Sequence, residues 1–324
     1  MAFPDFFPTL TPREQLAGLG SLAAFLIVSE KLHSRGHFPR TARPLAAAAV
    51  AGVILLPFIT GSLLLGTAII ALFLAESAMP RVKIDLLGEE SRLNAVYTFV
   101  NGAMEPLAFT IVYVTLYVPY PQTWGLRSHH VPVWIQGIGV LLLLDFMRYW
   151  RHRFQHQYDW WWKFHEIHHS SRQINWLAGG RAHIFEALIL GLGHNVVIYL
   201  LDVDLSALLF GFALPYTVVA FIFAHANLDF PRAGQPLPFW SYIITSPTTH
   251  AAHHRSDTDK TLYFGAILTI WDVIFGTFAP SVPKNVTYGT DPDFPDAYLE
   301  QQMEPFRKLI GSKRPIEQED GEAG

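Results

Sequence analysis

The chain reads HRFQH over residues 152–156, HEIHH over 165–169 and HAAHH over 250–254. Residues three or four apart lie on one face of a helix, so His152 and His156 can point at one centre. In the other two groups the first histidine has partners at both the third and the fourth position. The last two rings of each triplet leave the helix about 100° apart. Each triplet can therefore reach two adjacent centres.

The number of these histidines predicts a metal site with two centres. Neutral imidazole is a common protein ligand for iron, zinc, copper and nickel. Eight grouped ligands exceed the four of a tetrahedral site and suit two metals with open or water-filled positions. One such pair could be explained by core histidines, but three groups within a third of the chain could not. The chain has no cysteine, which excludes an internal disulfide, thiolate zinc and a Cys-ligated iron–sulfur cluster.

The composition is typical of a membrane protein. Hydrophobic residues make up 51% of the 324 residues and charged residues 15%, whereas about 25% are charged in ordinary soluble domains. The 24 phenylalanines and 9 tryptophans suit anchoring at a membrane interface. The net charge of −4 gives no indication of nucleic-acid binding.

Apolar runs recur along the chain, and a membrane-spanning helix needs about 20 residues. Residues 44–79 carry no charge before Glu76, so this stretch suits two spans with a turn at 57–61. Further spans are expected at 97–120, 131–150, 184–201 and 205–223. The run 16–28 is short for a span, and 261–278 could lie along the interface or pack under the histidines.

These runs predict an all-α, polytopic membrane protein with a histidine-rich helical cap. Lys and Arg concentrate at 31–43, 81–92 and 148–181 and in the C-terminal tail, so the positive-inside rule places the cap and the C-terminus in the cytoplasm. We expect three regions: a membrane-spanning region at 1–130, a catalytic region with the histidine groups at 131–281, and a polar, partly disordered tail at 282–324.

Several charged residues near these spans have two interpretations each. Glu105 is either paired at membrane depth or close to the interface. Asp145 lies two helical turns before His152 and could orient that ring, or it could pair with Arg148. The basic residues near the histidines could bind an anionic headgroup or an acidic electron donor, although positive-inside charge is the simpler explanation; they are Arg148, Arg151, Arg153, Lys163, Arg172 and Arg181.

At this point the motifs resemble a family. DFMRYWRHRFQH, WKFHEIHHSS, INWLAGGRAH, SPTTHAAHH and the final WDVIFGTF are similar to the fatty acid hydroxylase / sterol desaturase superfamily, over about residues 130–280. Its members are integral membrane enzymes with histidine boxes of the forms HxxxH, HxxHH and HxxHH. The resemblance implies a non-haem diiron centre that uses O₂ as co-substrate to hydroxylate or desaturate a lipid.

The resemblance also implies which residues bind the metals. It carries over the eight grouped histidines and adds His225 of the HAN segment; the expected ligands are His152, His156, His165, His168, His169, His225, His250, His253 and His254. Asp145, Arg181, His183, His194 and Asn227 are expected to support the ligands or to face the substrate. No catalytic residue is expected beyond the metal centre.

The reaction that this resemblance implies needs two electrons per turnover. The sequence shows no flavin or NAD fingerprint and no HPGG segment of cytochrome b5. A separate electron donor is therefore expected: a ferredoxin, a cytochrome b5 or a reductase. The lipid and the membrane complete the expected partners.

Other functions fit parts of the pattern. Histidine ligands also suit a zinc-dependent membrane hydrolase, for which Glu166 inside HEIHH would be the candidate base, although its position between the ligands favours a side chain that faces away. A non-catalytic metal-binding membrane protein would need the same residues. A haem-binding electron carrier is less consistent with HxxHH triplets. Neither the lipid nor the choice between hydroxylation and desaturation follows from the sequence.

Overall fold

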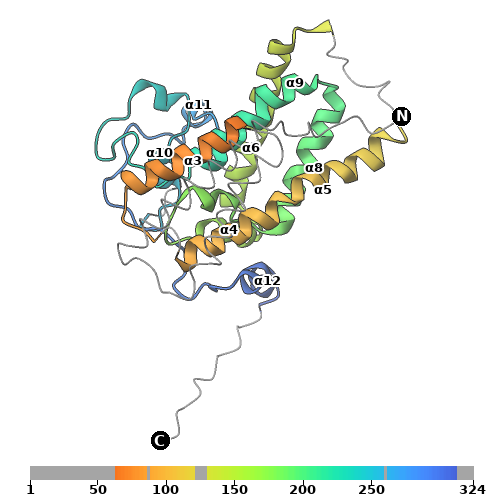
Figure 1. The fold of residues 1–324 in the computed structure, drawn as a ribbon. Helices are drawn as coiled ribbons and strands as arrows, with labels where there is room; N and C mark the ends of the chain where they lie inside the picture. The colour runs from red at the N-terminus through yellow and green to blue at the C-terminus, as the bar shows by residue number, and fades with distance from the viewer. Residues whose placement is uncertain (1–62, 86–87, 121–129, 259–260, 312–324) are drawn as a thin grey trace, which may run out of the picture.

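The computed structural model describes residues 63–311, apart from 86–87, 121–129 and 259–260 (Figure 1). Helices dominate this part of the chain, which has isolated β-bridges but no β-strand. The all-α prediction is therefore confirmed. The apolar run at 16–28 and most of the two spans expected at 44–79 lie outside the described residues.

The chain is built from the following helices. The first half contains α3 (Leu63–Ala78), α4 (Glu89–Gly102), α5 (Met104–Val112), the π-helix η1 (Tyr113–Tyr117), α6 (Val133–Gln157) and α7 (Asp159–His169). The middle contains the 3₁₀-helix η3 (Trp176–Gly180), α8 (Ile184–Leu201), α9 (Leu205–Leu208) and the π-helices η4 (Leu209–Ala213) and η5 (Tyr216–Phe223). The last part contains the 3₁₀-helix η6 (Phe239–Tyr242), α10 (Pro247–His253), α11 (Ile270–Ile274) and α12 (Tyr298–Leu309).

Four helical stretches are long and apolar enough to cross a membrane. They are Glu89–Tyr117, Val133–Gln157, Ile184–Leu201 and Ser206–Phe223. They correspond to the four spans expected between residues 97 and 223. Most of their side chains face outward from the protein, as expected for helices whose solvent is lipid rather than water. The protein is therefore an integral membrane protein.

Small residues let two of these spans approach closely. α6 packs against α9 and η4, and α5 lies alongside α8 (Figure 1). At the α6–η4 contact, a Cβ added to Gly211 would lie 2.5 Å from the Cα of Gly137. Close contact of this kind drives helix association in membranes, where lipid is as apolar as leucine.

Replacing Gly211 with alanine is expected to force the two helices apart, because the clashing atoms belong to backbone. The expected cost is about 1–3 kcal/mol of folding free energy. The unfolding midpoint in detergent micelles measures it. Gly193→Ala in α8 is the matched control, since nothing lies within 4 Å of its added Cβ. Equal midpoints for the two variants would contradict this account of the contact.

The segment 261–278 packs beneath the histidines, which decides between its two expected positions. The Phe264 ring lies 5.7 Å from the His152 ring, 5.4 Å from His156 and 5.5 Å from His253. The segment therefore supplies one apolar wall beside the clustered histidines.

The predicted polar tail contains an ordered helix. α12 packs against α7 and α4, and buries Gln301, whose amide oxygen accepts a hydrogen bond from the Tyr97 hydroxyl at 2.8 Å. Lys308 pairs with Glu166 on α7. These polar side chains are buried because each has a partner from another helix, which composition alone cannot reveal. The segment 313–324, expected to be disordered, lies outside the described residues.

Candidate metal centre

Nine histidines form two adjoining groups. Within each group, one ring nitrogen of every residue lies within 4.8 Å of the others. The five-histidine group is His152, His156, His165, His169 and His253. The four-histidine group is His168, His225, His250 and His254. These nine residues are the ones expected from the sequence to bind metal.

Each HxxHH triplet contributes to both groups. In HEIHH, His165 and His169 join the five-histidine group, whereas His168 joins the four-histidine group. In HAAHH, His250 and His254 share one group, and His253 joins the other. Residues four apart therefore face one centre and the residue between them turns to the second, as helix geometry predicts. The rings of His169 and His254, one from each group, stack at 4.4 Å.

Local sequence explains how the helices present these rings. α6 ends at Gln157, and Tyr158 is extended, so the chain turns back immediately into α7. The short helix α10 begins with a capping box, in which Ser246 and Thr249 satisfy each other's backbone N–H groups, and Pro247 occupies its first turn. The capping box and Pro247 fix where α10 begins, and so determine in which direction each side chain of this seven-residue helix points.

Backbone carbonyls fix the orientation of four of the rings. The Nδ1 atoms of His152, His168 and His253 each lie 2.9 Å from a carbonyl oxygen, and that of His225 lies 3.0 Å from one. A carbonyl only accepts, so each Nδ1 carries the proton and each Nε2 keeps a free lone pair. Metal-binding histidines are held in this way.

The arrangement of the Nε2 atoms fits bound metal ions. The Nε2 atoms of His168 and His225 lie 3.4 Å apart, although both carry lone pairs. In the other group, the Nε2 atoms of His152, His156 and His165 are buried without a hydrogen-bond partner. Facing lone pairs repel, and buried acceptors without partners cost about 1–3 kcal/mol each. A cation in each group would satisfy both conditions.

The histidines beyond the spans are in the protonation state that a metal requires. Burial lowers the pKa of His225 to about 4 and the pKa of His253 to about 3. Burial first, and then neighbouring histidines, also lower the pKa of His168, His169, His250 and His254 well below 6.5. Neutral imidazole, the form that binds metal, is therefore the favoured form at neutral pH.

Glu186 supports the site, although sequence reasoning did not single it out. Its carboxylate accepts hydrogen bonds from His165 Nδ1 at 3.1 Å, Arg151 Nη1 at 2.9 Å and the Gln155 amide. The signal available was a single acid near the start of the apolar run 184–201. Its negative charge makes the Nε2 lone pair of His165 a stronger ligand for a metal ion, and the hydrogen bond holds that ring in place.

Replacing Glu186 with glutamine is expected to weaken metal binding about ten- to hundredfold, because the partner of a ligand histidine loses its charge. Competition with a chelator, followed by metal analysis, measures the affinity. Glu300→Gln, at an exposed position of α12, is the control. Unchanged affinity in the Glu186 variant would remove this residue from the site.

Two buried aspartates hold the segment that carries the carbonyls. Asp145 accepts from the backbone N–H groups of Ile267 and Leu268 and from the Trp271 indole, at 2.9–3.0 Å. It accepts no hydrogen bond from a histidine or from Arg148, although its charge interacts with that of Arg148 over a longer distance. Asp272, which sequence reasoning missed, accepts from the N–H groups of Phe264 and Gly265 at 2.7 and 2.8 Å.

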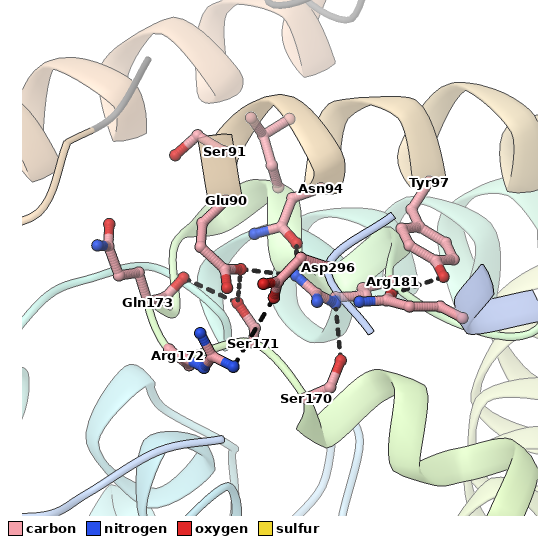
Figure 2. Close-up of polar contacts among 12 residues, drawn as sticks. Glu90, Ser91, Asn94, Tyr97, Ser170, Ser171, Arg172, Gln173, Arg181 and Asp296 are labelled. Atoms are coloured by element: carbon pink, nitrogen blue, oxygen red, sulfur yellow. Dashed lines mark hydrogen bonds and ion pairs between the residues drawn. The ribbon is translucent and has the colours of Figure 1, made fainter. Parts of the chain in front are cut away.

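Arg181 fixes the loop before α8 (Figure 2). Its guanidinium donates to Glu90 at 2.7 Å, to Asn94 at 3.0 Å and to the Ser170 hydroxyl at 3.1 Å. Its own carbonyl oxygen is the one that orients His168. Arg181 therefore supports the candidate ligand His168 through its backbone carbonyl, and its charge is paired with Glu90.

Three other expected residues have separate positions. His183 caps α8 by accepting from the Phe185 N–H, and its Nε2 bonds the Gln302 carbonyl, away from the cavity. Asn227 binds the backbone of Val82 with both side-chain atoms, so it anchors the chain after α3. His194 belongs to neither histidine group but lines the cavity beside them.

A cavity of about 500 Å³ adjoins both histidine groups. His152 and His165 line it from one group, and His168, His225 and His250 from the other. The rest of its wall is mainly apolar and comes from the spans, including Leu190, Ile198, Leu208, Phe212 and Ala213. The cavity can therefore place an apolar molecule next to the metal site.

Comparison with known proteins agrees with the family resemblance of the histidine motifs. The fatty acid hydroxylase family model matches residues 137–277. Ornithine lipid hydroxylase OlsE of Rhizobium tropici is 31% identical over 207 residues, which are 61% of this chain and 57% of that protein. Human alkylglycerol monooxygenase is 30% identical over 203 residues, 62% of this chain and 43% of that protein. Alkylglycerol monooxygenase of Danio rerio is 30% identical over 159 residues, 48% and 32% respectively.

The chain thus spans between 32% and 57% of the length of these relatives. No solved structure matches it. The matched residues include all nine clustered histidines: the eight of the HxxxH, HxxHH and HxxHH motifs, and His225. Residues 137–277 therefore match the fatty acid hydroxylase family, in agreement with the resemblance of the histidine motifs to the fatty acid hydroxylase / sterol desaturase superfamily.

Proposed function

We propose that this protein is a membrane-bound, O₂-dependent diiron oxygenase that hydroxylates a lipid. The observation that carries the proposal is the division of both HxxHH triplets between two centres that share one apolar cavity. Two adjoining metals suit oxygen chemistry, and a cavity between spans suits a substrate that arrives from the bilayer.

The five-histidine and four-histidine groups would each hold one iron. Bound iron would supply the oxidising power for inserting one atom of O₂ into a C–H bond, and two electrons and two protons would convert the other atom to water. The residues of this chain hold the ligand rings in one tautomer, through backbone carbonyls and Glu186. The apolar wall excludes water and positions the lipid.

The names of the relatives support hydroxylation over desaturation. The matched proteins are an ornithine lipid hydroxylase and alkylglycerol monooxygenases. Desaturation is then a second outcome of the same chemistry, and it would appear as a loss of two hydrogens from the product.

The zinc hydrolase interpretation lacks a positioned base. Glu166 pairs with Lys308 of α12 and does not line the cavity. Neither histidine group contains a carboxylate among the described residues. A non-catalytic metal-binding protein would not need the adjoining cavity.

We also propose that the site and the C-terminus face the cytoplasm and that electrons come from a separate ferredoxin, cytochrome b5 or reductase. The concentration of Lys and Arg around the histidine groups supports this orientation. The absence of cysteine from the chain supports an external electron source.

The test uses the full-length protein in nanodiscs, loaded either with iron or with zinc, together with a reductase and ¹⁸O₂. We expect the iron form alone to produce a lipid that is heavier by one ¹⁸O atom, detected by mass spectrometry. Turnover by the zinc form without O₂, or incorporation of oxygen from labelled water only, would refute the proposal.

A further inference from the structure

Two charged side chains of the cavity wall make no direct ion pair. Arg148 from α6 and Glu105 from α5 both line the cavity, and Arg148 interacts with Glu105 and Asp145 only through longer-range electrostatics. The other cation and anion of the wall, Arg151 and Glu186, pair with each other at 2.9 Å. An uncompensated charge in such a place is costly unless a ligand pairs with it.

Arg148 has hydrogen-bond donors to spare. Its side chain is only 7% exposed, its Nη2 donates to the Tyr216 hydroxyl, and its guanidinium lies 3.8 Å above the Tyr216 ring. Its Nε and Nη1 are buried without a partner. Asp145 interacts with Arg148 electrostatically but accepts no hydrogen bond from it; its carboxylate accepts from three N–H groups instead. The free edge of the guanidinium suits a carboxylate or a phosphate.

Glu105 presents a carboxylate to the same space. One oxygen accepts from the Asn195 amide at 2.9 Å. The other lies where a Cβ at position 191 would be 2.8 Å away, so Gly191 leaves room for it. A neutral amide does not cancel the negative charge. The wall therefore offers a positive site and a negative site, which interact electrostatically but form no ion pair or hydrogen bond with each other.

The positions of the lining residues along α6 and α8 give the order in which histidines, charged residues and apolar residues follow one another in the cavity. Arg148 is four residues before His152 on α6, about 6 Å of helical rise. On α8, Glu186 contacts His165, and Asn195 follows nine residues later, about 13 Å further along. Beyond the charged pair, the wall consists of apolar residues such as Ile198, Leu208 and Phe212. The charged residues thus lie between the histidines and the apolar end.

We propose that Arg148 and Glu105 bind the polar end of a zwitterionic lipid, the anionic group on Arg148 and an ammonium on Glu105. The lipid tail then lies toward the apolar end, and the polar end reaches the histidines. The oxidised C–H bond lies in the headgroup or within a few bonds of it, not in the middle of an acyl chain. This inference rests on the proposed oxygenase function, with the same balance of one O₂, two electrons and two protons for each hydroxyl group and water formed.

The experiment offers the iron-loaded protein four lipids in nanodiscs: one with an amino-acid headgroup, phosphatidylethanolamine, phosphatidylglycerol and a neutral diacylglycerol. Tandem mass spectrometry locates the ¹⁸O atom. Native mass spectrometry measures lipid binding to the metal-free protein, independently of turnover. The variants are Arg148→Gln, Arg148→Lys and Glu105→Gln, and the controls are Arg232→Gln and Glu300→Gln at exposed positions.

We expect oxygen in the polar end of one or both zwitterionic lipids, which also tells an amino-acid headgroup from a phosphate headgroup. Arg148→Gln and Glu105→Gln should each weaken binding about ten- to hundredfold, as expected for loss of a charge-assisted hydrogen bond. Arg148→Lys should restore part of that binding, and the controls should match the unmodified chain.

Three results would overturn this inference while leaving the oxygenase function intact. They are oxygen placed in the middle of an acyl chain, equal turnover of the neutral lipid, and equal binding of phosphatidylethanolamine by the unmodified and Glu105→Gln proteins. Absence of ¹⁸O from every lipid would instead count against the proposed function. The binding data would then still test the charged pair.

Discussion

Replacing His168 or His253 with alanine is expected to remove one metal ion from the protein and to abolish lipid oxidation. The two residues come from different triplets and belong to different groups, four-histidine and five-histidine respectively. Loss of a ligand should exceed the ten- to hundredfold effect of losing a supporting partner, so activity should fall more than about a hundredfold. Metal analysis should give close to one ion per chain in each variant.

The comparison between the two variants tests the assignment of two separate centres. Each should keep the ion of the undamaged group, and the double variant should keep neither. His130→Ala is the control, because this exposed histidine precedes α6 and belongs to neither group. If both single variants retained two ions with unchanged affinity, these histidines would not be ligands.

Replacing Asp272 with alanine should cause one of the largest losses of stability among the residues outside the histidine groups. The change leaves the N–H groups of Phe264 and Gly265 and the Thr277 hydroxyl without their buried acceptor. At about 1–3 kcal/mol for each buried unsatisfied group, with partial relaxation, we expect a loss of about 3–5 kcal/mol. The unfolding midpoint in detergent measures it, with Asp293→Ala at an exposed position as control.

The same variant should affect the two groups unequally. The segment that Asp272 holds provides the Phe264 carbonyl for His152 and the Leu262 carbonyl for His253, both in the five-histidine group. The four-histidine group takes its carbonyls from Arg181 and Ala220, which lie elsewhere. Partial chelation should therefore release the ion of the five-histidine group first. Equal release from both groups would show that the segment does not position His152 and His253.

Helical periodicity made much of the site predictable. The spacing of three and four residues in HEIHH and HAAHH determines that each triplet faces two directions, and the structure places the rings in two groups. The four spans between residues 97 and 223 were predictable because apolar length is a local property. His225 needed the family resemblance, since one histidine after an apolar run carries no pattern of its own.

Tertiary structure decided what holds those histidines and what faces the substrate. The ring of His152 is oriented by a backbone carbonyl 112 residues away. Because every residue has such a carbonyl, residue type alone does not indicate which one binds the ring. Glu186 on α8 acts through contacts with α6 and α7, and Asp145 binds backbone N–H groups of residues 267 and 268. Asp272 binds the backbone N–H groups of Phe264 and Gly265 in the loop before α11, which helical periodicity does not reveal. The sequence by itself predicted the eight grouped histidines as candidate ligands and their division between two centres, because both follow from residue type and helical period. The tertiary structure decided the supporting hydrogen bonds and the place of Arg148 and Glu105 in the cavity wall, since these depend on which backbone and side-chain groups meet in three dimensions.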